Sequence, residues 1–132
     1  MRYDGQLRIP VSIGEFIDKI SILEIKLARI IDVEKIANVR HELALLKSIR
    51  TQHALTGATL DELSNELKAV NERLWDIEDQ IRESERKSDF GTRFIAHARG
   101  VYKLNDRRAA LKRKINKLFD STVVEEKSYS DY

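Results

Sequence analysis

Apolar residues recur at alternating spacings of three and four along most of this 132-residue chain. That spacing places them on one side of an α-helix and is typical of helical bundles and coiled coils. The chain has only one proline and five glycines, so little in it interrupts long helices. We therefore predict an all-α fold, an antiparallel helical bundle of about four helices arranged as two hairpins.

The helix starts are predicted from capping residues. Ser12 and Glu15 have the spacing of a capping box, so a first helix should begin at residue 13 and run to Ile31. Asp32 is a plausible cap for a second helix near residues 33–55.

The second half of the chain should form the second hairpin. Thr59 and Glu62 have the spacing of another capping box and predict the start of a third helix. The periodicity lapses near residues 88–92, and a fourth helix should follow. Its predicted apolar stripe consists of Phe94, Ala98, Val101, Ile115 and Phe119.

We expect a single helical domain over residues 1–132. Residues 1–12 should form a short extended lead-in, residues 13–119 the bundle, and residues 120–132 an acidic tail.

Composition and motifs narrow the chemistry. The chain has no cysteine, which excludes disulfides and thiolate chemistry, and we find no zincin, phosphate-loop or dinucleotide-binding motif. We therefore expect no metal and no cofactor. The N-terminal residues do not resemble a signal peptide, and no apolar run is long enough to span a membrane. These features predict a cytoplasmic protein without a membrane partner.

Charge is sorted between the third and fourth helices. Residues 59–90 carry ten acidic and five basic side chains, whereas residues 91–119 carry one acidic and nine basic. Antiparallel packing would set the acidic surface against the basic one. Five cations form a stripe on the outer face of the fourth helix: Arg99, Lys103, Arg107, Lys114 and Lys117. Because ion pairing should neutralise this stripe and no aromatic residues interleave it, we do not expect nucleic acid as a partner.

Several polar side chains fall within the apolar stripes and define the candidate site. Glu24 interrupts the stripe of the first helix, and its carboxylate is predicted to point toward the core. Antiparallel pairing of the third and fourth helices should bring further polar residues beside it. The predicted cluster comprises Glu24, Asn71, Trp75, Glu78, Tyr102, Asn105, Arg108 and Lys112.

Two interpretations of this cluster remain open. It is either a closed network that fixes helix register, or a ligand site. In a ligand site, Arg108 and Lys112 would bind an anionic group such as a phosphate, a carboxylate or a nucleotide sugar. Glu24 or Glu78 would orient a hydroxyl or act as a base, with Trp75 as part of a stacking wall alongside Tyr102.

Four segments resemble an uncharacterised family of short bacterial and phage proteins, labelled only as a domain of unknown function. They are IPVSIGEFIDKISILEIKLARI (9–30), NERLWDIEDQIR (71–82), VYKLNDRRAALKRKIN (101–116) and EEKSY (125–129). Similar proteins carry the same polar positions, and some occur near glycosyltransferase genes. The matching positions here are Glu24, Lys26, Asn71, Trp75, Glu78, Tyr102, Asn105 and Asp106. The resemblance implies that the domain serves some function, but it does not indicate an activity.

We expect a non-enzymatic helical interaction or assembly module. Ile22 and Ile25 lie on the first helix away from its main stripe, which suggests burial on two sides and predicts a homo-oligomer, a dimer or larger. The alternative is a small-molecule binding protein or enzyme with an intra-bundle site for an anionic ligand.

Overall fold

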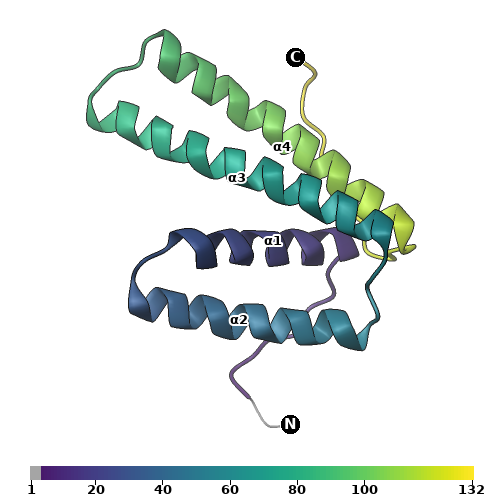
Figure 1. The fold of residues 1–132 in the computed structure, drawn as a ribbon. Helices are drawn as coiled ribbons and strands as arrows, with labels where there is room; N and C mark the ends of the chain where they lie inside the picture. Colours follow the sequence, from purple (N-terminus) through teal and green to yellow (C-terminus); the bar gives the residue numbers. More distant parts are fainter. Residues whose placement is uncertain (1–3) are drawn as a thin grey trace.

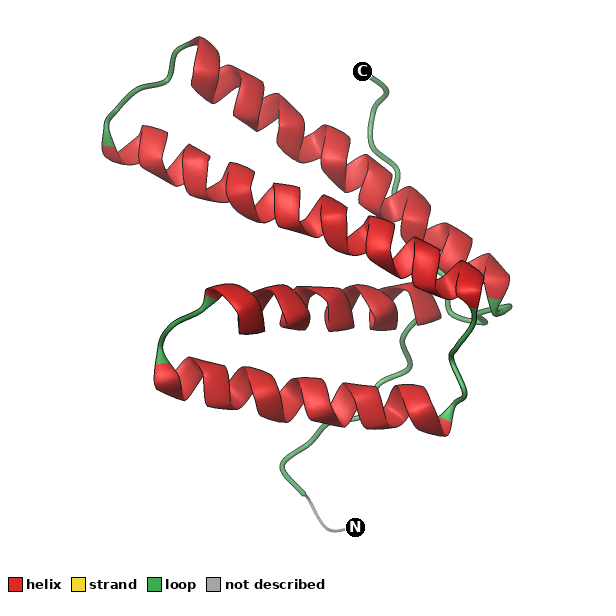
Figure 2. Cartoon of the chain, viewed as in Figure 1, coloured by secondary structure: helices red, strands yellow, loops and turns green. Residues whose placement is uncertain are grey.

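The structure is a computed structural model that describes residues 4–132. It contains four helices, α1 (Ile13–Arg29), α2 (Val33–Gln52), α3 (Ala58–Arg86) and α4 (Thr92–Leu118). The described residues form no strand, and loops account for the rest (Figure 2). The predicted all-α bundle of two helical hairpins is confirmed. No helix in this part of the chain is both long and apolar enough to cross a membrane.

Helix α1 lies between the other three (Figure 1). Helices α3 and α4 pack against each other and both pack on α1, whereas α2 packs on α1 alone. Contacts from Gly14 to Asn116 and from Asp18 to Arg108 show that α1 and α4 run antiparallel. The bundle is therefore a central helix with α2 on one side and the α3/α4 hairpin on the other.

The two helices of the first hairpin start where the predicted N-caps place them. The Ser12 hydroxyl accepts a hydrogen bond from the amide of Glu15 at 3.0 Å, and Asp32 caps α2 through the amide of Lys35. Both helices end earlier than predicted. α1 stops at Arg29 instead of Ile31, and α2 stops at Gln52 instead of residue 55.

The capping box predicted at Thr59 is wrong. Helix α3 begins at Ala58 after Gly57, which offers no side-chain cap, so Thr59 already lies in the first turn. Asp61 pairs instead with Arg50 of α2 at 3.6 Å. This contact links α3 to α2 near the connection between the two hairpins.

The core is one apolar cluster contributed by all four helices and by Leu55 in the connection between α2 and α3. Its buried members are Phe16, Ile17, Ile20, Leu23, Val39, Leu43, Leu55, Leu60, Leu67, Val70, Leu104, Leu111 and Ile115. The predicted stripe of α4 is thus only partly correct. Leu104 and Leu111 are buried with Ile115, whereas Val101 is half-buried and borders a surface groove.

The second apolar face of α1 is explained within the chain. Ile25 is only 3% exposed, and Ile22 and Ile25 both face the α3/α4 hairpin. Packing within the chain therefore accounts for Ile25, because a central helix is covered on two sides by its own neighbours, whereas Ile22 stays half-buried at the edge of a surface groove.

Helices α1 and α4 approach closely at Gly14. The Gly14 amide donates a hydrogen bond to Asn116 Oδ1 at 2.6 Å, and the neighbouring Ile13 amide donates to Ser121 Oγ. A Cβ at position 14 would overlap the carbonyl oxygen of Lys112 and lie 2.9 Å from Asn116 Oδ1. Glycine is therefore required by the backbone of the facing helix.

Replacing Gly14 with alanine should lower the free energy of unfolding by about 1–3 kcal/mol, because the α1–α4 contact must open to admit the methyl group. Urea denaturation followed by circular dichroism measures this change. Gly91→Ala is the matched control, since a Cβ there meets nothing closer than 3.4 Å. Equal stability of the two variants would contradict the close approach.

Candidate functional site

The most buried charge in the described residues is the Asp18 carboxylate of α1, whose residue is 0% exposed. Arg108 of α4 binds it through two nitrogens, with Nε 3.0 Å from Oδ1 and a terminal nitrogen on Oδ2. Asn71 of α3 donates its amide to Oδ1 at 2.8 Å. One carboxylate therefore ties together three helices.

Ser21 completes this network. Its hydroxyl donates to the carbonyl oxygen of Asp18 and accepts from the Asn71 amide, both at 2.8 Å. The hydrogen bond with Asp18 raises the pKa of the Arg108 guanidinium above its ordinary value. Hydrogen bonds thus reach both carboxylate oxygens, as a buried charge requires. We call Asp18, Ser21, Asn71 and Arg108 the Asp18 network.

Sequence reasoning missed Asp18 and Ser21, although a signal for them existed. Helical spacing puts both on the same face of α1 as Ile22 and Ile25, and that face was recognised as apolar. Asp18 and Ser21 are polar residues within this second apolar stripe, and the α3/α4 hairpin buries them. Asn71 and Arg108 were correctly expected to face each other. The contact between them is made by Asp18, to which both donate hydrogen bonds.

A groove next to the Asp18 network brings together five of the eight predicted residues. It has a volume of about 440 Å³ and runs between α1, α3 and α4. We name it the α1/α3/α4 groove, and its lining includes Ile22, Ile25, Asn71, Leu74, Trp75, Glu78, Val101, Asn105 and Arg108. The side chain of Arg108 is 28% exposed here, so the network has one open edge.

Trp75 and Glu78 have partners of their own along the groove. The guanidinium of Arg29 lies 5.9 Å from the centre of the Trp75 ring and also binds Asp76 at 2.5 Å. Glu78 is exposed and pairs with Arg82 one turn further along α3.

The other three predicted residues lie elsewhere. Glu24 does not point into the core; it is partly exposed and lies 3.7 Å from Lys68 of α3. Tyr102 is exposed on another face of α4, where its ring packs 5.0 Å from that of Tyr132 in the tail. Lys112 of α4 is largely buried, and its ammonium contacts the first turn of α1. A stacking wall of Trp75 and Tyr102 is therefore wrong, because Tyr102 packs instead against the tail.

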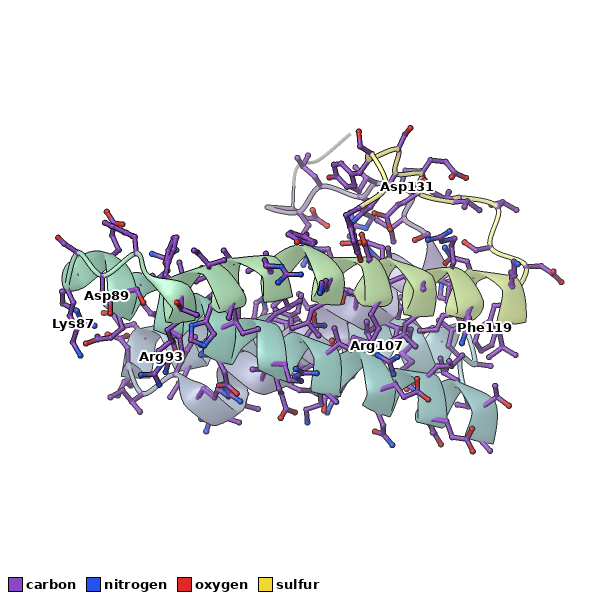
Figure 3. The ribbon with its side chains drawn as sticks, turned by 90° about the horizontal axis from the view of Figure 1, so that it is seen from above. Lys87, Asp89, Arg93, Arg107, Phe119 and Asp131 are labelled. Atoms are coloured by element: carbon purple, nitrogen blue, oxygen red, sulfur yellow. The ribbon has the colours of Figure 1, made fainter. Side chains whose placement is uncertain are left out.

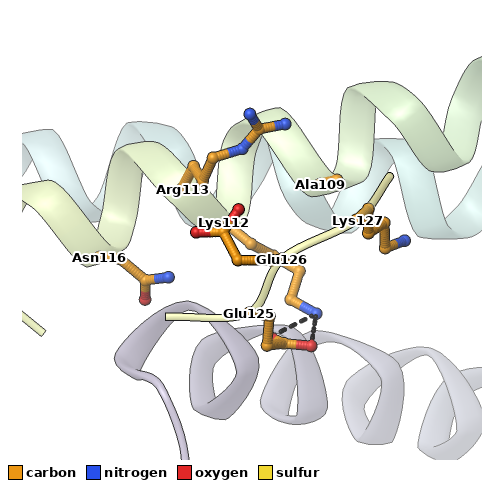
Figure 4. A pocket seen from close by; sticks show the side chains of 7 residues that line it. All are labelled: Ala109, Lys112, Arg113, Asn116, Glu125, Glu126 and Lys127. Atoms are coloured by element: carbon orange, nitrogen blue, oxygen red, sulfur yellow. Dashed lines mark hydrogen bonds and ion pairs between the residues drawn. The ribbon is translucent and has the colours of Figure 1, made fainter. Parts of the chain in front are cut away.

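Lys112 anchors the C-terminal tail (Figure 4). Its ammonium binds Glu15 of α1 at 2.5 Å and Glu125 of the tail at 3.1 Å, and Glu125 also accepts from Ser12. Burial alone lowers the pKa of Lys112, but the hydrogen bonds to Glu15 and Glu125 outweigh it and raise that pKa. Burial likewise raises the pKa of Glu125, yet Lys112 lowers it overall. Both cations of the predicted anion site, Arg108 and Lys112, are thus paired with carboxylates of the chain itself.

The expected pairing of an acidic α3 with a basic α4 is largely wrong. Arg107 with Glu66 at 3.6 Å is the single ion pair between these helices within residues 4–132. The other paired acids of α3 bind α1, α2 or cations near their own position. Helices α3 and α4 contact mainly through apolar side chains, with Leu60, Leu67 and Val70 of α3 in the same core cluster as Leu104, Leu111 and Ile115 of α4.

The chain belongs to a family of unknown function (DUF6165), whose model matches residues 7–132 and so includes all four helices and the tail. The resemblance seen in the sequence is confirmed to that extent. No curated protein and no solved structure matches the chain. Residues 4–132 contain no group of three or more His, Cys, Asp or Glu side chains placed to hold a metal ion.

Replacing Arg108 with methionine should destabilise the fold by about 3–5 kcal/mol, because it leaves the buried Asp18 carboxylate without its charge partner. The double variant Asp18→Leu/Arg108→Met should recover most of that loss, since apolar groups replace both charges. Chemical denaturation of both variants measures the difference. A double variant no more stable than Arg108→Met alone would contradict a closed network.

The tail contact should be lost at both extremes of pH. The pKa of Glu125 is lowered, so the ionised carboxylate stabilises the tail contact above the ordinary glutamate pKa of about 4.3. This stabilisation is lost as the pH falls through the lowered value. The pKa of Lys112 is raised, so its contribution is present at neutral pH and is lost as the pH rises through the raised value.

Nuclear magnetic resonance of the tail signals across this pH range checks the expectation. Glu125→Gln should release the tail at neutral pH without unfolding the helices, whereas Glu126→Gln is the neighbouring control. A tail that stays docked in Glu125→Gln would refute the role of this ion pair.

Proposed function

We propose that this protein is a non-enzymatic helical interaction module that self-associates, with the α1/α3/α4 groove as its docking surface. The groove carries the proposal because it presents half-buried apolar side chains beside the Asp18 network. Ile22, Leu74 and Val101 supply this apolar surface. Contiguous apolar surface of this kind is typical of protein interfaces.

A second copy of the chain is the occupant that the exposed residues favour. The connection between α1 and α2 and the tip of the α3/α4 hairpin lie at the same end of the molecule (Figure 1). At the α1–α2 connection, Ile31 and Val33 are 92% and 82% exposed. At the tip of the α3/α4 hairpin, Phe90 and Ile95 are more than half exposed. A hairpin tip of one copy entering the groove of another would bury both surfaces, and symmetric exchange would close a dimer.

The arrangement of the carboxylates supports a role without catalysis. Asp18 accepts hydrogen bonds on both oxygens and faces no solvent, so it is not available as a base. Glu24 of α1 and Glu78 of α3 are at least partly exposed to solvent, and each is paired with a cation of α3, Lys68 and Arg82 respectively.

A small anionic ligand is the second candidate, favoured by the open edge of Arg108. That edge lies in the groove with Asn105 and Glu78, and a volume of about 440 Å³ is within the range of small-molecule sites. Binding of phosphate, a dicarboxylate or a nucleotide sugar at about 100 times its dissociation constant would add roughly 2.7 kcal/mol of stability. Such stabilisation would not depend on protein concentration, whereas self-association does.

Sedimentation velocity over a wide range of protein concentration tests the proposal. The wild-type chain should form a dimer or larger species, and Val101→Asp in the groove or Ile95→Asp at the hairpin tip should shift it to monomer. Leu45→Asp is the matched control, because Leu45 is a 38% exposed apolar residue of α2, outside the groove. A wild-type chain that stays monomeric, or a control that dissociates as readily, would overturn self-association through this surface.

A further inference from the structure

The outer face of α4 carries a line of cations that the fold does not neutralise. Arg99, Lys103, Arg107, Lys114 and Lys117 are all exposed. At 100° per residue they fall within a sector of about 80°, and they extend over about 27 Å of helix. We call these five residues the α4 basic stripe. Figure 3 shows Arg93, Arg107 and Phe119 spread along this helix.

Neighbouring acids leave most of the stripe unpaired. Only Arg107 has an ion-pair partner among residues 4–132, the exposed Glu66 at 3.6 Å. Asp106 is the single acidic residue of α4 and lies outside the sector, on the side of the tail, where its carboxylate raises the pKa of the Tyr132 phenol. Four cations on one face are therefore free to contact an external anion.

The side chains between these cations indicate the kind of anion. Ala96 and Ala110 are the nonpolar residues inside the sector, so the face has no aromatic ring for stacking the bases of a single strand. It also lacks the large apolar residues that anchor an amphipathic helix in a membrane surface. A line of like charge on a flat face fits a uniformly charged, rigid polyanion better than a protein surface of mixed charge.

From this geometry we infer that the α4 basic stripe binds the phosphate backbone of double-stranded nucleic acid without reading its sequence. Lysine and arginine side chains bind phosphate oxygens through charge-assisted hydrogen bonds and release counterions from the duplex. No side chain on the face is placed to read base edges specifically, since its neighbours are alanines. The stripe faces away from α1 and from the groove, and it meets the proposed self-association surface only at its end, where Ile95 of the hairpin tip lies one turn before Arg99.

Fluorescence anisotropy with a labelled DNA duplex of about two helical turns tests the inference. Four phosphate contacts should make affinity fall by roughly 100-fold between about 50 and about 200 mM salt, with no preference between unrelated sequences. The variant Arg99→Gln/Lys103→Gln/Lys114→Gln/Lys117→Gln should lose at least tenfold in affinity at low salt.

A second quadruple variant separates the stripe from net charge. Lys19→Gln/Lys35→Gln/Arg40→Gln/Lys47→Gln removes the same charge from exposed positions of α1 and α2 and should bind the duplex within about twofold of the wild type. Circular dichroism confirms that both variants fold, which is expected because every substituted side chain is exposed.

Three results would overturn the inference: no duplex binding by the wild-type chain at about 50 mM salt, equal loss in both quadruple variants, or affinity that does not change with salt. Vesicles of phosphatidylcholine and phosphatidylserine provide the remaining comparison. Binding to these vesicles with no binding to the duplex would assign the stripe to an acidic membrane surface and would also overturn it.

Discussion

The rest of the structure depends on burying the Asp18 carboxylate. A charge removed from water must be paired and hydrogen-bonded, and Asp18 obtains this from Arg108 of α4 and Asn71 of α3. Because the two donors come from different helices, the network specifies how the α3/α4 hairpin sits on α1. Apolar packing is less directional and would tolerate shifts that this network does not.

A second fixed point lies at the start of α1. Gly14 lets its backbone meet that of α4, and two side chains, Asn116 in the last turns of α4 and Ser121 just after it, accept hydrogen bonds from amides in the first turn of α1. Lys112 then joins Glu15 to Glu125 of the tail. These contacts hold the N-terminal half of α1 against the C-terminal half of α4. Toward the other end, the α3/α4 hairpin extends past α1 (Figure 1). The α1/α3/α4 groove is lined by Ile22 and Ile25 of α1 and by the side chains of α3 and α4 that face them.

Helix α4 presents three different surfaces as a result. Its inner face supplies Leu104, Leu111 and Ile115 to the core and Arg108 to the Asp18 network. The tail lies along a second side (Figure 3), and the basic stripe occupies the third. Internal carboxylates neutralise the inner cations, Arg108 and Lys112, whereas four outer cations keep their charge available. The family model covers all of these elements, and the proposed partners use separate faces of the same helix.

The sequence by itself determined the helices. Apolar spacing, Ser12 and Asp32 predicted their number, order and first two starts, because helix periodicity and capping are local properties of the chain. It also indicated that Asn71 and Arg108 belong together. Only the tertiary structure decided that Asp18, and not Glu24, is the buried acid, since that depends on which face of α1 each hairpin covers. The tertiary structure also decided which α4 cations form ion pairs. Such pairing depends on how α3 and α4 are rotated about their axes, and the periodicity of a single helix does not determine that rotation.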